Sequence, residues 1–161
     1  MARTLDGNAL EITRRFEAPI QRVWQAWTDP RALSQWFGPG EAPSVTQADL
    51  DVRPGGHYTI AFRTPDGEDS RVSGRYEAVV APHTLSFSWA WQSTPDRVSF
   101  IRIALEAEGT GTVMRFRHDR FFDSAARDNH SRGWSAALEK FAHWVEVPVP
   151  SWSAAVTLRN H

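Results

Sequence analysis

The chain has 161 residues, which suits one domain rather than two. It carries 18 basic and 19 acidic residues, a formal net charge of -1, and it contains no cysteine. The lack of cysteine excludes disulfides, iron–sulfur clusters, thiolate zinc sites and a cysteine nucleophile. A nucleic-acid-binding domain would normally present a basic face, so the balanced charge predicts no nucleic-acid partner.

The sequence also lacks the features of a membrane or secreted protein. Its longest uncharged stretch, residues 78–95, contains Pro82, Pro95 and several hydroxyl side chains, and it does not suit a membrane span. The first residues, Met-Ala-Arg-Thr-Leu-Asp, have no apolar core of the kind found in signal peptides. We therefore expect a soluble, cytoplasmic domain, and its eight tryptophans indicate an aromatic-rich interior.

The first predicted element is a strand over residues 10–17. Its apolar residues Leu10, Ile12 and Phe16 alternate with polar ones, which is typical of a strand with one buried face. Arg14 shares their phase, so we expect its side chain to point inward. A buried guanidinium needs a carboxylate or a ligand anion, and both an internal ion pair and ligand recognition stay open.

Two short helices are predicted next. The first is opened by Ala18-Pro19, and the second has Asp29 as its cap with Pro30 at the first helical position. Gly38-Pro39-Gly40 ends the second helix. The apolar residues expected to face the core are Val23, Trp24, Trp27, Leu33, Trp36 and Phe37.

From Ser44 onward the apolar period is two, and turn signals divide the chain into six strands. The connections are too short for parallel crossovers, so the strands should form an antiparallel meander. The inward positions are Ala48, Leu50 and Val52; Tyr58, Ile60 and Phe62; Val72, Gly74, Tyr76 and Val80; Leu85, Phe87, Trp89 and Trp91; Ile101, Ile103 and Leu105; and Met114, Phe116 and His118.

A long helix from Ala126 to Val145 follows, with Asp123 or Ser124 as its cap. Residues 1–146 then form a single domain and residues 147–161 a C-terminal tail. The order of elements predicts an α+β fold in which a curved, seven-stranded antiparallel sheet wraps around the long C-terminal helix. One cylinder fills such a concave surface poorly, so a cavity between sheet and helix is expected.

Several short motifs resemble those of the SRPBCC superfamily. They are Leu10-Glu-Ile-Thr-Arg-Arg-Phe-Glu-Ala-Pro, Val23-Trp24, Ala26-Trp27-Thr28-Asp29-Pro30, Trp36-Phe37-Gly38-Pro39, Asp51-Val52-Arg53-Pro54-Gly55-Gly56 and Gly133-Trp134. Within the superfamily, residues 9–146 are most similar to the branch homologous to the C-terminal domain of the activator of heat-shock-protein ATPase. The resemblance implies the helix-grip fold of START domains and the birch-pollen allergen, with a ligand cavity between the sheet and the C-terminal helix.

The resemblance leaves three functions open. Family members include carriers of apolar ligands, polyketide cyclases and aromatases, and cochaperone domains. We favour binding of a small, largely apolar or aromatic molecule without catalysis. The alternatives are a cyclase or aromatase that uses a cavity histidine or tyrosine, and a domain that interacts with a heat-shock-protein ATPase. No catalytic residue, metal site or cofactor is predicted.

The candidate ligand-binding residues are those that alternation and helical spacing turn toward the expected cavity. For each aromatic residue core packing is the competing interpretation, and for the two histidines it is a hydrogen-bonded structural role. The candidates are Arg14, Tyr58, Tyr76, Trp89, Trp91, Met114, Phe116, His118, His130, Trp134 and Leu138. Trp144 and Trp152 are candidate surface tryptophans, and they keep a homodimer open.

Overall fold

The computed structural model describes residues 2–5 and 9–147. The expected tail beyond residue 147, including Trp152, lies outside the described residues. The elements in chain order are β1 (Ala2–Leu5), β2 (Ala9–Phe16), α1 (Ile20–Thr28), α2 (Pro30–Leu33), β3 (Val45–Leu50), β4 (His57–Arg63), β5 (Asp69–Val80), β6 (Thr84–Trp91), β7 (Ser99–Glu108), β8 (Gly111–Asp119) and α3 (Ser124–Glu146).

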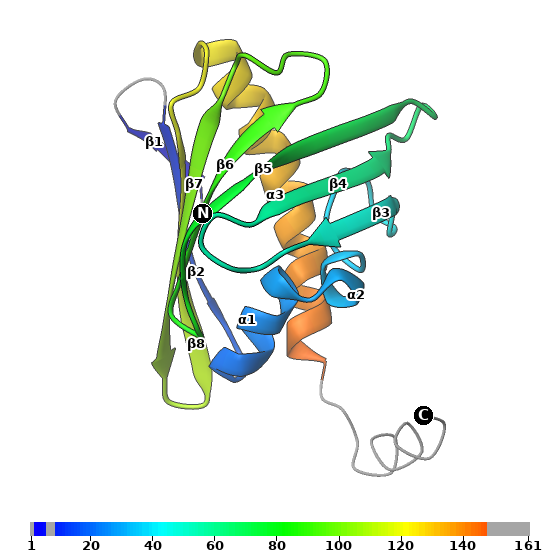
Figure 1. Ribbon diagram of the computed structural model, residues 1–161. Helices are drawn as coiled ribbons and strands as arrows, with labels where there is room; N and C mark the ends of the chain where they lie inside the picture. The colour runs from blue at the N-terminus through cyan, green and yellow to red at the C-terminus, as the bar shows by residue number, and fades with distance from the viewer. Residues whose placement is uncertain (1, 6–8, 148–161) are drawn as a thin grey trace.

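The strands form one curved antiparallel sheet in the order β1-β2-β8-β7-β6-β5-β4-β3. The seven predicted strands are all present, and β1 adds an eighth strand that pairs with the outer edge of β2. Figure 1 shows the sheet curving around α3, with α1 and α2 covering one end of the concave face. The predicted helix-grip architecture is confirmed.

The two short helices begin and end close to the predicted residues. Asp29 caps α2, since its Oδ1 accepts from the backbone N–H of Arg31 at 2.8 Å, and Pro30 occupies the first helical position. Regular helix ends at Leu33, and a turn carries the chain on to Phe37. The predicted apolar residues of the two helices are nevertheless buried, with Trp36 fully enclosed, except that Trp24 is half-buried.

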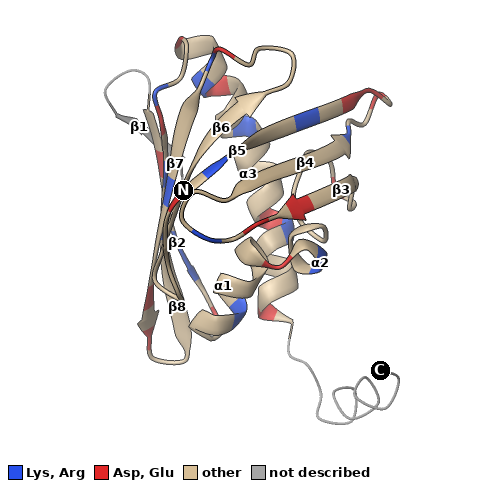
Figure 2. Ribbon diagram, in the orientation of Figure 1, with Lys and Arg blue, Asp and Glu red and all other residues tan. Residues whose placement is uncertain are grey.

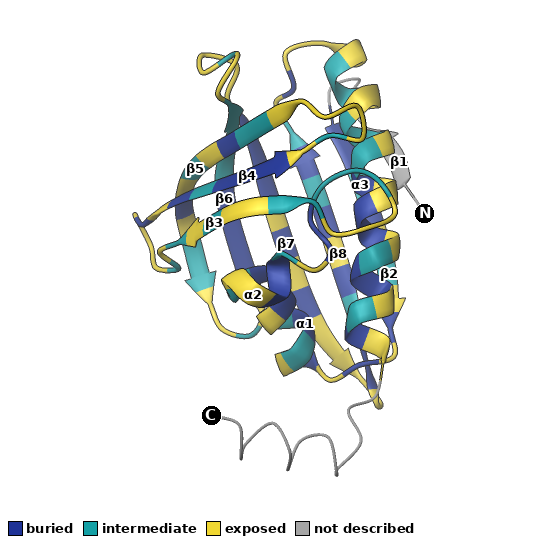
Figure 3. Ribbon diagram, turned by 90° about the vertical axis from the view of Figure 1, so that its right-hand side faces the viewer, coloured by how far each residue is buried: buried dark blue, intermediate teal, exposed yellow. Residues whose placement is uncertain are grey.

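Helix α3 supplies one wall of the core. Its cap is Asp123, whose carboxylate accepts from the backbone N–H of Ala126 at 2.8 Å. The apolar residues recur at helical spacing, and Figure 3 shows the buried ones on the side of α3 that faces the sheet. These buried residues are Trp134, Ala137, Leu138, Phe141, Ala142 and Val145.

Strand β5 departs from the regular alternation near its middle. Its register with β6 shifts between Tyr76 and Ala78, which changes the face presented by the residues that follow. Val80, expected to point inward with Tyr76, is therefore 58% exposed. At Gly74 an added Cβ would lie 2.0 Å from the Ser88 carbonyl oxygen, so the close approach of β5 and β6 requires glycine.

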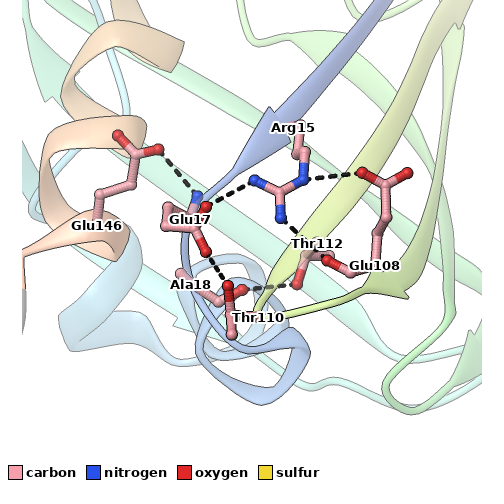
Figure 4. Close-up of polar contacts among 7 residues, drawn as sticks. All are labelled: Arg15, Glu17, Ala18, Glu108, Thr110, Thr112 and Glu146. Carbon is pink, nitrogen blue, oxygen red and sulfur yellow. Dashed lines mark hydrogen bonds and ion pairs between the residues drawn. The ribbon is translucent and has the colours of Figure 1, made fainter.

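Polar contacts fix the end of the sheet opposite the start of α3, as Figure 4 shows. The guanidinium of Arg15 donates to the carboxylates of Glu17 at 2.7 Å and Glu108 at 2.8 Å. The backbone N–H of Glu17 in turn donates to Glu146 at 3.0 Å, near the end of α3. The network therefore joins β2, the β7–β8 hairpin and α3 at that end.

Candidate ligand cavity

A large hollow lies between the first half of α3 and the ends of β4 to β7. Its volume is about 640 Å³. It is lined by Phe37, Gly38, Pro39, Phe62, Thr64, Ser70, Trp89, Trp91, Thr94, Arg97, Ser99, Phe121, Phe122, Ala126, Asn129, His130, Gly133, Trp134 and Ala137. Ligand pockets in proteins typically measure about 300–1,000 Å³, so the size suits a small organic molecule.

Seven phenylalanine and tryptophan rings line the cavity, and several of them contact one another. The ring of Phe37 lies 5.9 Å from both Phe62 and Trp89, and Trp89 lies 5.4 Å from Trp91 in an edge-to-face arrangement. Trp134 from α3 completes the group at 5.3 Å from Trp89. The rings hold each other in place and present an apolar surface to the hollow.

His118 lies directly behind this wall and is completely buried. Its Nδ1 accepts from the indole N–H of Trp134 at 3.1 Å, because an indole nitrogen can only donate. The proton of the neutral ring must then sit on Nε2, which donates to Ser99 Oγ at 2.7 Å. The Ser99 hydroxyl continues the chain by donating to the Trp89 carbonyl at 3.4 Å.

His130 has the opposite tautomer. Its Nδ1 lies 2.7 Å from the Ala126 carbonyl oxygen, which can only accept, so this nitrogen carries the proton. Its Nε2 accepts from the indole N–H groups of Trp91 at 2.9 Å and Trp89 at 3.3 Å. The two imidazole rings lie 5.2 Å apart, centroid to centroid.

These contacts keep both rings neutral. Burial lowers the pKa of His118 well below its usual value, and the nearby His130 lowers it further. Burial likewise lowers the pKa of His130, partly offset by its hydrogen bond to Ala126. An imidazolium cannot accept from an indole, so protonation of either ring would break the bonds described above. The lone pair of each ring is already occupied, and neither ring is placed as a free general base.

The mouth of the cavity has a different chemistry. Arg97, in the loop between β6 and β7, places its guanidinium carbon 3.8 Å from the ring centroid of Phe122, which is 61% exposed. Thr94 and Asn129 also line this region. The exposed part of the lining therefore includes a charged side chain, whereas the rings of Phe37, Phe62 and Trp89 are buried.

The only lysine of the chain holds the loop that closes one side of the cavity. Lys140, on α3, directs its Nζ to the carbonyl oxygens of Gly38 at 2.9 Å and of Pro39 and Ala42 at 3.4 Å. Partial burial lowers the pKa of this amine. Lys140 thus fastens the segment after α2 to α3, next to Phe37.

The structure brings part of the predicted candidate set together. Trp89, Trp91, His130 and Trp134 line the cavity. His118 lies behind them and is bonded to Trp134. Phe116 packs against Trp134 with the ring centroids 4.7 Å apart, and it does not line the cavity.

Other candidates lie elsewhere in the concave face. Tyr58 and Tyr76 pack against Phe87 in a separate aromatic group, and the Tyr58 hydroxyl donates to the Ser88 carbonyl at 2.7 Å. Burial raises the pKa of both tyrosines. The last two apolar candidates, Met114 and Leu138, are fully enclosed in the core.

Arg14 does face the helix, as its phase predicted. Its Nη1 pairs with Glu139 of α3 at 3.2 Å, and its side chain is 30% exposed. Its guanidinium carbon also lies 5.4 Å from the Phe16 ring. Arg14 does not line the cavity, and of the two interpretations left by the sequence the geometry provides an ion pair between sheet and helix.

The sequence pattern did not single out several cavity residues. Phe37 and Phe62 were expected to point inward, but no sequence feature distinguished residues that line the cavity from residues that pack in the core. Arg97, Phe122 and Asn129 lie in loops or on the first turns of α3, where no apolar period marks them. A weak signal was available for Arg97, since it is a basic residue in the loop after the Trp-Ala-Trp strand.

No helix within residues 9–147 is both long and apolar enough to cross a membrane. In the same range no group of three or more histidine or acidic side chains is placed to hold a metal ion.

Trp144 is half-buried, with the Arg22 guanidinium carbon 4.0 Å from its ring centroid.

The curved sheet wrapped around a long C-terminal helix is an architecture shared with known proteins. The family model described as Activator of Hsp90 ATPase homolog 1-like protein matches residues 17–146. The chain belongs to this family. The resemblance expected from the sequence motifs is therefore confirmed. A comparison with curated proteins finds no match.

Solved structures of this fold are similar over nearly the whole chain. Protein CV1439 from Chromobacterium violaceum is 25% identical with a TM-score of 0.78, covering 88% of this chain and 99% of its own. Protein Ms6760 from Mycobacterium smegmatis is 27% identical with a TM-score of 0.77, covering 94% and 96% respectively. CalU16 from Micromonospora echinospora is 25% identical with a TM-score of 0.63, covering 89% and 82%.

Proposed function

We propose that this AHSA1-like protein binds a small, largely apolar molecule in the cavity between α3 and the sheet. The observation that carries the proposal is the hollow of about 640 Å³ with its wall of contacting aromatic rings. Ligand-binding clefts are typically concave and lined mainly by apolar and aromatic side chains with a few polar groups, and this hollow has that character. An apolar ligand would replace water against the rings and gain the free energy of burying both surfaces.

The same geometry favours a protein that binds its ligand without converting it. A cyclase or aromatase needs a group that takes up or releases a proton beside the ligand. Both histidine lone pairs near the cavity accept from indoles, and Tyr58 and Tyr76 do not line it. We therefore propose a binding protein, active in the cytoplasm, as the composition suggests.

The proposal is tested with N-phenyl-1-naphthylamine, an uncharged probe that fluoresces on entering apolar sites. Titration of the wild-type protein should give saturable binding with energy transfer from the cavity tryptophans. Gly133 offers a way to fill the hollow, because it lines the cavity and a Cβ built there meets nothing within 4 Å. Gly133→Leu should abolish or strongly weaken binding without unfolding the protein, since leucine also favours helix.

A matched control places the same side chain on another part of α3. Ala136 is exposed and does not line the cavity, so Ala136→Leu should bind the probe like the wild type. Equal affinity of the wild type and Gly133→Leu would overturn the proposal. Native mass spectrometry of the purified protein provides an independent measurement, because a tightly held molecule would appear as added mass.

The family match supports a second candidate, interaction with a heat-shock-protein ATPase, since the family description names an activator of Hsp90 ATPase. Measuring the ATPase rate of purified Hsp90 with and without this protein tests the candidate. An increase that Gly133→Leu also produces would show that such an activity does not depend on the cavity.

A further inference from the structure

The charge of the cavity lining is confined to one side chain. Of the described residues that line the hollow, only Arg97 carries a full charge at neutral pH. The other basic groups close to the wall add no charge to the lining. His118 and His130 are held neutral by their indole donors and by burial, and Lys140 is not a lining residue and directs its Nζ to backbone carbonyl oxygens. A ligand in the cavity therefore meets one positive charge and no negative one along the described lining.

The position of Arg97 leaves its guanidinium able to interact with a ligand. The Arg97 guanidinium carbon lies 3.8 Å from the centroid of the Phe122 ring, and within residues 9–147 no carboxylate forms an ion pair with this guanidinium. The nearest capping carboxylate, Asp123, already accepts from the backbone N–H of Ala126. Stacking on a ring leaves the edge of a guanidinium, where its N–H groups point, free to donate.

The charge also sits at one end of the hollow. Figure 1 shows the loop between β6 and β7 beside the start of α3, where Arg97 and Phe122 meet. The rings of Phe37, Phe62 and Trp89 are buried, whereas Phe122 is 61% exposed. An occupant that matches both regions has an apolar body and one polar end.

We infer that the cavity selects amphipathic anions, namely aromatic or aliphatic molecules that carry one carboxylate or sulfonate. The inference rests on the proposed binding function and specifies its ligand class. The apolar body contacts the rings, and the anion stays at the mouth, where it pairs with Arg97 and keeps part of its hydration. Asn129 supports the anion, because its Oδ1 accepts from Arg132 while its amide N–H groups remain to donate.

A pair of probes with the same rings separates this inference from the proposed function. N-phenyl-1-naphthylamine is uncharged, and 1-anilinonaphthalene-8-sulfonate adds one sulfonate to the same skeleton. The wild type should bind the sulfonate more tightly than the uncharged probe. Arg97→Gln should weaken sulfonate binding about three- to fivefold, as for a partly exposed ion pair, and leave the uncharged probe unchanged.

Two variants control for charge and position. Arg97→Lys keeps the charge and should restore part of the sulfonate affinity. Arg115 lies on the opposite face of the sheet with 59% of its side chain exposed, so Arg115→Gln removes one charge without touching the cavity. Its affinities should match those of the wild type. Added salt should weaken sulfonate binding to the wild type more than to Arg97→Gln, because salt screens the ion pair.

The outcomes are distinguishable. If the uncharged probe binds and Arg97→Gln leaves the sulfonate affinity unchanged, the inference is wrong and the proposed function stands. If neither probe binds to the wild type, the proposed function fails and the inference fails with it. Equal losses of sulfonate affinity in Arg97→Gln and Arg115→Gln would show a general charge effect and would also overturn the inference.

Discussion

Acid should destabilise this fold through the buried His118 and the half-buried His130. The folded pKa of each ring lies below the usual 6.5, because burial and the indole bonds favour the neutral form. Below that value the unfolded chain binds protons that the folded chain excludes, so the free energy of unfolding falls as the pH falls. The full stability is present above about pH 6.5.

Each histidine contributes a slope of at most about 1.4 kcal/mol per pH unit between its unfolded and folded pKa values. The variant His130→Gln removes the contribution of His130 to the pH dependence of the free energy of unfolding. The amide oxygen of glutamine still accepts from the Trp91 indole but does not titrate. Urea unfolding followed by tryptophan fluorescence, between about pH 7.5 and pH 5.5, gives the slopes. The variant should lose up to about 1.4 kcal/mol per pH unit of the wild-type dependence.

A replacement of the exposed His143 by glutamine is the matched control, because it changes the same residue type on α3 outside the core. The difference between variant and wild type also cancels contributions from carboxylates. Parallel stability–pH curves for the wild type and His130→Gln would refute the reasoning, since they would mean that His130 takes up its proton equally well in the folded and unfolded protein.

Three further predictions concern single side chains. Gly74→Ala should lower the free energy of unfolding by about 1–3 kcal/mol, because its Cβ would overlap the Ser88 carbonyl oxygen; an unchanged urea midpoint would contradict this. Lys140→Met leaves carbonyl oxygens of the segment after α2 without their donor, so amide hydrogen exchange in that segment should accelerate. Unaltered exchange would show that Lys140 does not hold the segment in place. Arg14→Met should cost less than about 1 kcal/mol, since Glu139 is exposed, and should leave probe affinity unchanged.

The fold could be predicted because its signals are local and periodic. Alternation placed Leu10, Ile12 and Phe16 on one face of a strand, and all three are buried. Asp29 and Asp123 were recognised as helix caps from residue type and position, and both accept the expected backbone N–H bonds. Strand β1 has only four residues, too few to show a period, and it was not predicted.

The candidate cavity could be predicted only in part. Alternation tells which side chains point inward, but it does not separate residues that line a hollow from residues that fill the core. Trp89 and Tyr58 share an inward phase, yet one lines the cavity and the other packs against Phe87. The function of Arg97 depends on a loop that brings it over Phe122, and no sequence period records such a contact.

The hydrogen bonds from three tryptophan indoles to two histidine imidazoles determine which part of the cavity can distinguish one ligand from another. Because every tryptophan N–H of the inner wall is already bonded, that wall offers a ligand only ring faces and edges, which discriminate little among apolar shapes. Discrimination then falls to the loops at the mouth, which lie outside the sheet and the core. Substitutions in those loops could change the preferred ligand while the inner wall, and the stability that it provides, stay the same.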